Sequence, residues 1–141
     1  MNIVRSIVGV VAGFVIGMIV IFVIQMVNGY LHPLPAGVDP RNFEDFKQIW
    51  STLPTTAFIG LLLSYLFGVF FAAFAAAKIA GRGEVVHGFI ISVLYALIGI
   101  SNFTAFPAPV WVTVGSFVIY FVAGFLGASF AGSLRKVKTA E

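Results

Sequence analysis

Four long apolar stretches fill most of the chain, and nearly every charged side chain lies in the gaps between them. Each stretch has 22 or more residues, and Lys78 is the only charged residue that any of them contains. About 20 helical residues cross a hydrocarbon core of roughly 30 Å, and a backbone in lipid must satisfy its own hydrogen bonds. The sequence therefore predicts an all-α integral membrane protein, a four-helix transmembrane bundle. The predicted spans cover about residues 6–27, 53–79, 85–106 and 109–134.

The composition leaves room for one membrane domain, residues 1–141, and for no soluble domain beside it. Four spans with short loops use up the 141 residues, of which 60% are hydrophobic and 9% are charged. The chain contains no cysteine, which excludes disulfides, thiolate metal sites and cysteine nucleophiles.

The basic residues are distributed unevenly between the two sides of the membrane. Six of the eight lie before the first span, between the second and third, or after the fourth: Arg5, Lys78, Arg82, Arg135, Lys136 and Lys138. Only Arg41 and Lys47 lie in the first loop, beside three acidic residues. Because cytoplasmic loops are enriched in Lys and Arg, both termini are expected in the cytoplasm and the first loop outside. The net charge of +3 then reflects membrane orientation, and no nucleic-acid partner is expected.

The first apolar stretch has an alternative interpretation, as a cleaved signal peptide. One Arg precedes it, as in such peptides. The stretch is too long for the apolar region of a signal peptide, however, and no A-x-A cleavage site follows before Tyr30. We therefore expect the first span to be retained.

The first loop is predicted to hold a short amphipathic helix, about residues 40–50, that lies on the outer membrane surface. Three prolines in the eight residues 33–40 exclude a helix before it, whereas Asp39 followed by Pro40 is typical of a helix start. Apolar residues then recur on one helical face: Phe43, Phe46, Ile49 and Trp50. Two environments are open for this face, the lipid surface or the ends of the protein's own helices.

The ends of the second span carry capping signals. Ser51 or Thr52 is expected to cap its start, and Gly81 is expected to end it in the left-handed conformation. The connection after Gly81 is short, so the second and third spans should form an antiparallel hairpin.

Small residues recur four apart on every span, which is the strongest internal pattern of the chain. Such stripes let helix backbones approach closely in lipid. The candidate helix-packing residues are Gly9, Gly13, Gly17, Gly60, Ser64, Gly68, Ala72, Ala76, Gly88, Ser92, Gly124, Ala128 and Gly132. The stripes predict packing within one chain, and the alternative is association between copies. The second span has the longest stripe and is expected to be the central helix.

His32 and Asp39 are the best candidates for chemistry, with Asp45 as a third member of a candidate outer-loop site. A His–Asp pair can transfer protons or bind a metal. The alternative is structural, because Asp39 can cap a helix and His32 can bond a backbone group. Two ligands make a poor metal site, and His87 is expected at the opposite membrane surface, so no metal and no cofactor are expected. No acidic or basic residue lies in the middle of a span, which argues against ion-coupled transporters and proton relays.

The order of segments along the chain forms a longer pattern. A span is followed by HPLPAGVDP, an acidic amphipathic helix, a span start of the STLP type, and a small-residue-rich span that ends in KIAGR. This order resembles a family of small four-span bacterial membrane proteins that carries no assigned activity. The resemblance implies the four-span fold and a location in a bacterial inner membrane, and it implies nothing about activity.

Three functions are compatible with these features. We expect first a non-enzymatic accessory or scaffold subunit, packed in the lipid bilayer within a homo-oligomer or a larger membrane complex. A small-solute or lipid pathway built from an oligomer is the second, and a polar stripe of Ser64, Ser92, Ser116 and the span tyrosines on facing helices would favour it. An outer-surface enzyme is the third, and it requires His32, Asp39 and Asp45 to converge in one pocket.

Overall fold

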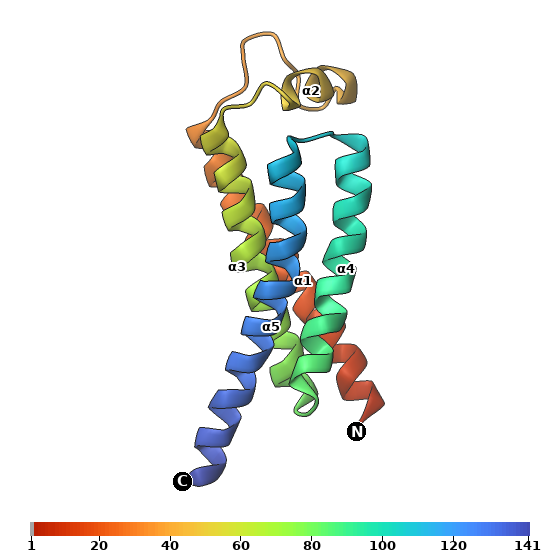
Figure 1. Cartoon of the computed structure of the whole chain (residues 1–141), viewed down its shortest axis with the longest axis vertical. Coiled ribbons are helices and arrows are strands. Elements are labelled where there is room, and N and C mark those ends of the chain that lie inside the picture. The colour runs from red at the N-terminus through yellow and green to blue at the C-terminus, as the bar shows by residue number, and fades with distance from the viewer. Residues whose placement is uncertain (1) are drawn as a thin grey trace.

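The computed structural model describes residues 2–141, and every regular element in that range is a helix. In chain order the helices are α1 (Ile3–Leu31), α2 (Phe43–Trp50), α3 (Thr55–Ala80), α4 (Glu84–Ala105) and α5 (Val110–Ala140) (Figure 1). The four long helices α1, α3, α4 and α5 are each long and apolar enough to cross a membrane. The predicted fold class is thus confirmed: an all-α bundle of four candidate spans with a short helix in the first loop.

The bundle has two chemically different ends (Figure 1). The basic end holds both chain ends and the α3–α4 turn, and it comprises residues 2–6, 78–87 and 131–141. The loop end holds the α4–α5 connection, and α2 lies across it. The six basic residues that the sequence assigns to one side of the membrane therefore lie together at the basic end.

The two outermost helices of the sequence, α1 and α5, extend beyond the predicted spans. α1 begins at Ile3 because the side chain of Asn2 caps it, accepting a hydrogen bond from the backbone N–H of Arg5 (3.3 Å). α5 continues past Leu134 to Ala140, through a segment whose Lys and Arg residues favour helix. The predicted spans are shorter than these helices because hydropathy identifies only the apolar part of a helix, and a helix can extend beyond the membrane into water.

The start of α3 differs from the prediction. Its N-cap is Pro54, and no side chain caps the helix, so neither Ser51 nor Thr52 has the expected role. Its end is as expected, because Gly81 adopts a left-handed conformation (φ +77°) and donates its N–H to the Ala77 carbonyl oxygen (3.1 Å).

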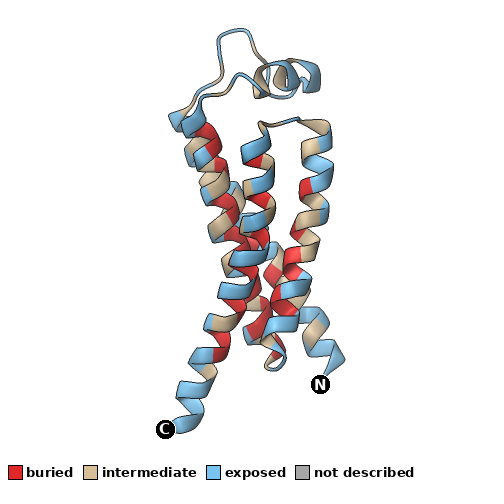
Figure 2. Ribbon diagram, in the orientation of Figure 1, coloured by how far each residue is buried: buried red, intermediate tan, exposed pale blue. Residues whose placement is uncertain are grey.

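α3 is the central helix of the bundle. It contacts α1, α4 and α5, and twelve of its 26 residues are buried. α1 is peripheral, since only three of its 29 residues are buried and all three are glycines. Figure 2 shows the buried residues running down the length of α3, while the outer faces of the bundle are exposed as expected for a protein surrounded by lipid.

α1 packs on α3 backbone to backbone. A Cβ atom added at Gly9 would lie 2.7 Å from the carbonyl oxygen of Ala76, and one added at Gly17 would lie 2.7 Å from the carbonyl oxygen of Gly68. Ordinary van der Waals contact begins at 3.4 Å, so a side chain at either position requires the helices to separate. Two stripes of small residues therefore face each other: Gly9, Gly13 and Gly17 on α1, and Gly68, Ala72, Ala76 and Ala80 on α3.

α4 and α5 approach each other in the same way. A Cβ atom at Gly88 would lie 2.6 Å from the carbonyl oxygen of Gly124 and 2.7 Å from the Cβ atom of Ala128. The hydroxyl of Ser92 donates across the two helices to the carbonyl oxygen of Tyr120 (2.8 Å). The small residues of these two helices are thus used for contacts within one chain.

Candidate functional site

His32 lies at the loop end, at the C-terminus of α1, and joins that helix to the start of α3. Its Nδ1 atom lies 3.1 Å from both the carbonyl oxygen and the side-chain oxygen of Asn28, and its Nε2 atom lies 2.9 Å from the hydroxyl oxygen of Thr56. Because Nδ1 faces two acceptors, we assign its proton there, and Nε2 then accepts a hydrogen bond from Thr56. Both ring nitrogens are therefore engaged in linking helix ends.

The two acidic members of the predicted outer-loop site lie elsewhere. Asp39 accepts a hydrogen bond from the backbone N–H of Arg41 (2.9 Å) and so closes a turn. The prediction that it caps α2 is wrong, because the N-cap is Asn42, whose side-chain oxygen accepts from the N–H of Asp45 (3.4 Å) and of its neighbour Glu44. Within residues 2–141, no hydrogen bond or ion pair joins His32 to Asp39 or Asp45.

A row of polar side chains on α1, which we call the polar seam, faces α3 below His32. It consists of Gln25, Asn28 and His32, spaced i, i+3 and i+7 on one helical face. The amide nitrogen of Gln25 donates to the hydroxyl of Ser64 (3.1 Å), and that of Asn28 donates to the carbonyl oxygen of Ala57 (3.0 Å). The seam thus continues the α1–α3 contact from the glycines toward the loop end, with hydrogen bonds in place of backbone contact.

Gly60 and Ser64, two of the candidate packing residues, accommodate this seam. A Cβ atom at Gly60 would overlap the amide of Asn28, so only glycine leaves room for that side chain. Ser64 is fully buried, and its hydroxyl donates to the carbonyl oxygen of Leu61 (2.6 Å) while it accepts from Gln25. The sequence does not mark Asn28 as a site residue by its type alone, but its spacing from Gln25 and His32 places all three on one helical face.

A pocket of about 460 Å³ opens between the polar seam and α2. Its lining is mainly apolar, with Phe46 and Trp50 of α2 among the apolar residues, and the side chains of the polar seam supply its polar groups. The pocket residues are Gln25, Asn28, Gly29, His32, Leu34, Phe46, Trp50, Leu53 and Ala57. The indole N–H of Trp50 is buried and has no hydrogen-bond partner. We call this cavity the loop-end pocket; it includes His32 and neither Asp39 nor Asp45.

The apolar face of α2 packs on the ends of the protein's own helices. The ring of Phe106, at the C-terminus of α4, lies 4.9 Å from that of Phe43, 5.4 Å from that of Phe46 and 5.9 Å from that of Trp50, measured between centroids. Trp50 also lies edge-on to Phe58 of α3 at 5.9 Å. Of the two environments open for this face, the structure shows the second, although Phe43 keeps half of its surface exposed.

The polar groups at the centre of the bundle bond mainly to backbone. Ser116 donates to the carbonyl oxygen of Val112 on its own helix (2.7 Å), and Ser92 bonds as described above. The hydroxyl of Tyr95 donates to the carbonyl oxygen of Phe14 (3.0 Å), which ties α4 to α1. Serines and tyrosines of α3, α4 and α5 are thus buried together, but their hydroxyls serve helix contacts.

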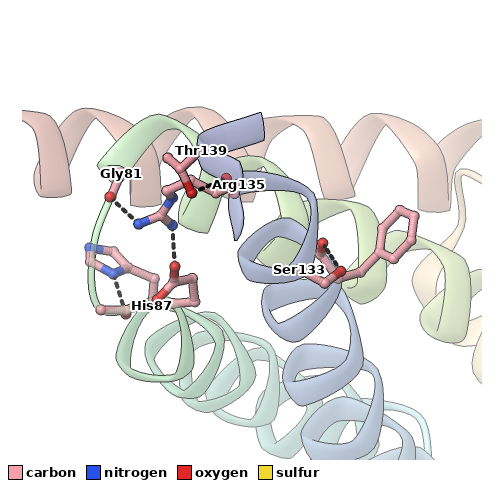
Figure 3. Close-up of polar contacts among 8 residues, drawn as sticks. Gly81, His87, Ser133, Arg135 and Thr139 are labelled. Carbon is pink, nitrogen blue, oxygen red and sulfur yellow. Dashed lines mark hydrogen bonds and ion pairs between the residues drawn. The ribbon is translucent and has the colours of Figure 1, made fainter. Parts of the chain in front are cut away.

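The basic end contains a second set of polar contacts, drawn in Figure 3. Arg135 of α5 forms an ion pair with Glu84 and donates a hydrogen bond to the carbonyl oxygen of Gly81. Gly132, one turn before Arg135, lies against the Glu84 side chain, and an added Cβ atom would be 3.2 Å from Glu84 Cγ. His87 is buried, and its Nδ1 atom lies 2.8 Å from the carbonyl oxygen of Gly83. The contacts of Arg135 hold α5 against the α3–α4 turn, and that of His87 joins α4 to the same turn.

Metal ligands do not gather anywhere in the described part of the chain. Over residues 2–141, no group of three or more His, Cys, Asp or Glu side chains lies close enough to hold one ion.

Comparison with protein-family models, with curated proteins and with solved structures finds no match for this chain.

Proposed function

We propose that this protein is a non-enzymatic accessory or scaffold subunit of the cell membrane. The observation that carries the proposal is that the polar side chains at both ends of the bundle bond one helix to another. His32 and Asn28 fasten α1 to α3, and Arg135 fastens α5 to the α3–α4 turn. Residue types that could carry chemistry thus hold helices together, which supports a role in packing over a role in a reaction.

The partners that we propose are the lipid bilayer and either further copies of the chain or a larger membrane complex, with no nucleic acid. α1 supports this proposal, because it is fastened to the bundle along one face and leaves a long apolar surface exposed. We further propose the inner membrane of a bacterium as the location, with both termini in the cytoplasm. The collection of six basic residues at the basic end supports that orientation.

Photo-crosslinking tests the subunit proposal. A photoreactive residue replaces Phe22, an exposed residue of α1, and in a matched variant it replaces Phe125, an exposed residue of α5. A partner that docks on one side of the bundle gives a discrete protein adduct at one position and only lipid adducts at the other. Lipid adducts alone at both positions, together with a monomer after extraction in mild detergent, would contradict the proposal.

A second candidate function, binding or passage of a lipid-like amphiphile, is favoured by the loop-end pocket. The pocket combines a mainly apolar lining with the polar side chains of the seam, which suits a molecule with one apolar and one polar part. With Trp111→Phe, Trp50 is the only tryptophan, so quenching by brominated lipids reports on the pocket.

Gly29→Leu supplies the matched variant for this second function, because Gly29 lines the pocket and has open space beside it. A side chain there fills the pocket and should lower the quenching of Trp50. Unchanged quenching would mean that lipid reaches Trp50 from the bulk bilayer and that the pocket holds no amphiphile.

A further inference from the structure

The basic end has a pocket of its own, and it lies between three helices. Its volume is about 450 Å³. Four cationic side chains line it, and no acidic side chain does: Arg5 from α1, Lys78 from α3, and Arg135 and Lys138 from α5. We call this cavity the basic-end pocket. Hydrogen bonds between helices explain where Arg5 and Arg135 lie, but they do not explain why four positive charges line one pocket.

Two guanidinium groups converge on one residue of this pocket. Arg135 donates to the carbonyl oxygen of Gly81. The Nε atom of Arg5 donates to the carbonyl oxygen of Ile79 (2.9 Å), and its terminal nitrogens lie 3.3 and 3.5 Å from where a Gly81 Cβ atom would be. Both cations are therefore held in place by backbone carbonyls, which fixes their geometry and leaves other N–H groups of Arg5 unused.

The charges of the pocket are not balanced by the protein. Within residues 2–141, Glu84 with Arg135 is the one acid–base pair in contact. The three other cations of the pocket have no carboxylate partner there, and like charges held close together repel one another. An anion bound among them would relieve this repulsion, and a phosphate group matches the donor geometry of a guanidinium.

The neighbouring surface indicates which phosphate-bearing molecule fits. Leu134 lines the same pocket and is exposed. Toward the middle of the bundle, Lys78 lies over the ring of Phe74 at 5.3 Å, and that ring lies 5.8 Å from Phe130, which is half exposed. A strip of apolar surface thus leads from the cationic pocket into the membrane, as an acyl chain requires.

We propose that the basic-end pocket binds the phosphate group of an anionic phospholipid, with an acyl chain along Phe74 and Phe130. Pockets of this kind between spans, on the side that carries the basic residues, suit anionic headgroups because both charge and desolvation favour binding. The inference does not depend on the proposed function, since a lipid site is compatible with a subunit, a scaffold or a lipid pathway.

Lys138→Gln tests the proposal, with Lys136→Gln as its matched control. Both lysines are exposed on the last turns of α5, but only Lys138 lines the pocket. Native mass spectrometry of the full chain in detergent measures binding of phosphatidylglycerol, phosphatidylcholine and inorganic phosphate. We expect tighter binding of phosphatidylglycerol than of phosphatidylcholine, and a loss of about fivefold in its affinity for Lys138→Gln. Lys138→Arg should restore binding, and Lys136→Gln should leave it unchanged.

Three results would overturn the proposal. Equal loss of affinity in Lys136→Gln and Lys138→Gln would show general surface attraction without a site. Equal binding of phosphatidylglycerol and phosphatidylcholine would show that the negative charge is not recognised. Displacement of phosphatidylglycerol by an equal concentration of inorganic phosphate would show that the pocket binds free phosphate and that the acyl chain contributes nothing.

Discussion

The closest approach of α1 to α3 yields a prediction that a single methyl group can test. At Gly13, an added Cβ atom would lie 2.9 Å from both the backbone nitrogen and the Cβ atom of Ala76, and it would overlap the carbonyl oxygen of Ala72. Most of these atoms belong to helix backbone, so no rotation of a side chain relieves the clash. Gly13→Ala therefore forces the two helices apart by about 0.5 Å to bring the Ala76 contacts to 3.4 Å, and by more to clear the Ala72 carbonyl oxygen.

Separating the two helices weakens the van der Waals contacts along the whole α1–α3 interface. A gap of 0.5–1 Å removes about a quarter to a half of the dispersion energy of each contact, and overpacking typically costs about 1–3 kcal/mol. Alanine also favours helix over glycine by up to about 1 kcal/mol, which opposes the loss. Gly29→Ala is the matched control, since it makes the same change on the same helix where nothing lies within 4 Å.

The assay is the free energy of reversible unfolding in mixed micelles titrated with a denaturing detergent. Gly29→Ala makes the same substitution on the same helix and so controls for the change from glycine to alanine, and Gly13→Ala should be less stable than Gly29→Ala by about 1–3 kcal/mol. Equal stability of the two variants would refute the reasoning, because it would mean that α1 does not rest on α3 at Gly13.

Three further predictions concern the loop end. Asn28→Leu removes the hydrogen bond to the Ala57 carbonyl oxygen and should lower unfolding free energy in the same assay by about 0.6–1.7 kcal/mol, with no loss contradicting a role for the polar seam. A cysteine at Gly37, in a chain without cysteine, should react with a membrane-impermeant maleimide outside intact cells, and labelling only after lysis would invert the proposed orientation. A spin label at Lys47 should be more accessible to a water-soluble relaxation agent than one at Phe46, whose ring packs on Phe106, and equal accessibility would argue against that packing.

The spans could be predicted because lipid leaves the backbone so few alternatives. A run of apolar residues in hydrocarbon has to form a helix, so composition and length suffice to identify it. The ends of the helices obey different rules. α5 continues to Ala140 because its last residues favour helix in water, and α2 starts at Phe43 because Asn42 reaches two backbone amides where Asp39 reaches one. Asp39 and Asn42, three residues apart, have similar strength as caps, and the local turn decides which of them starts the helix.

The contacts at the candidate site could be predicted from the sequence only in part, because a pattern on one helix does not identify its partner. Small residues recur on all four spans, so the spacing predicts close helix contacts but does not say which helix is the partner. The sequence does not distinguish Asn28 as a site residue, because polar residues are also common where an ordinary span reaches the membrane boundary. The role of Phe106 likewise depends on the folded structure. Its ring packs against the aromatic rings of α2 only because the α4–α5 connection lies beneath that helix.

The peripheral place of α1 has a consequence for how the protein is made. α1 leaves the ribosome before α3 exists, and it must remain in lipid without its partner until α3 has been inserted. A contact face made of Gly9, Gly13 and Gly17 exposes no side-chain polar group to lipid in the meantime, and the polar residues of the seam lie toward the end of the helix, where the headgroups are. The glycine face that later packs against α3 is thus also compatible with lipid, so α1 can remain in the membrane until α3 has been inserted.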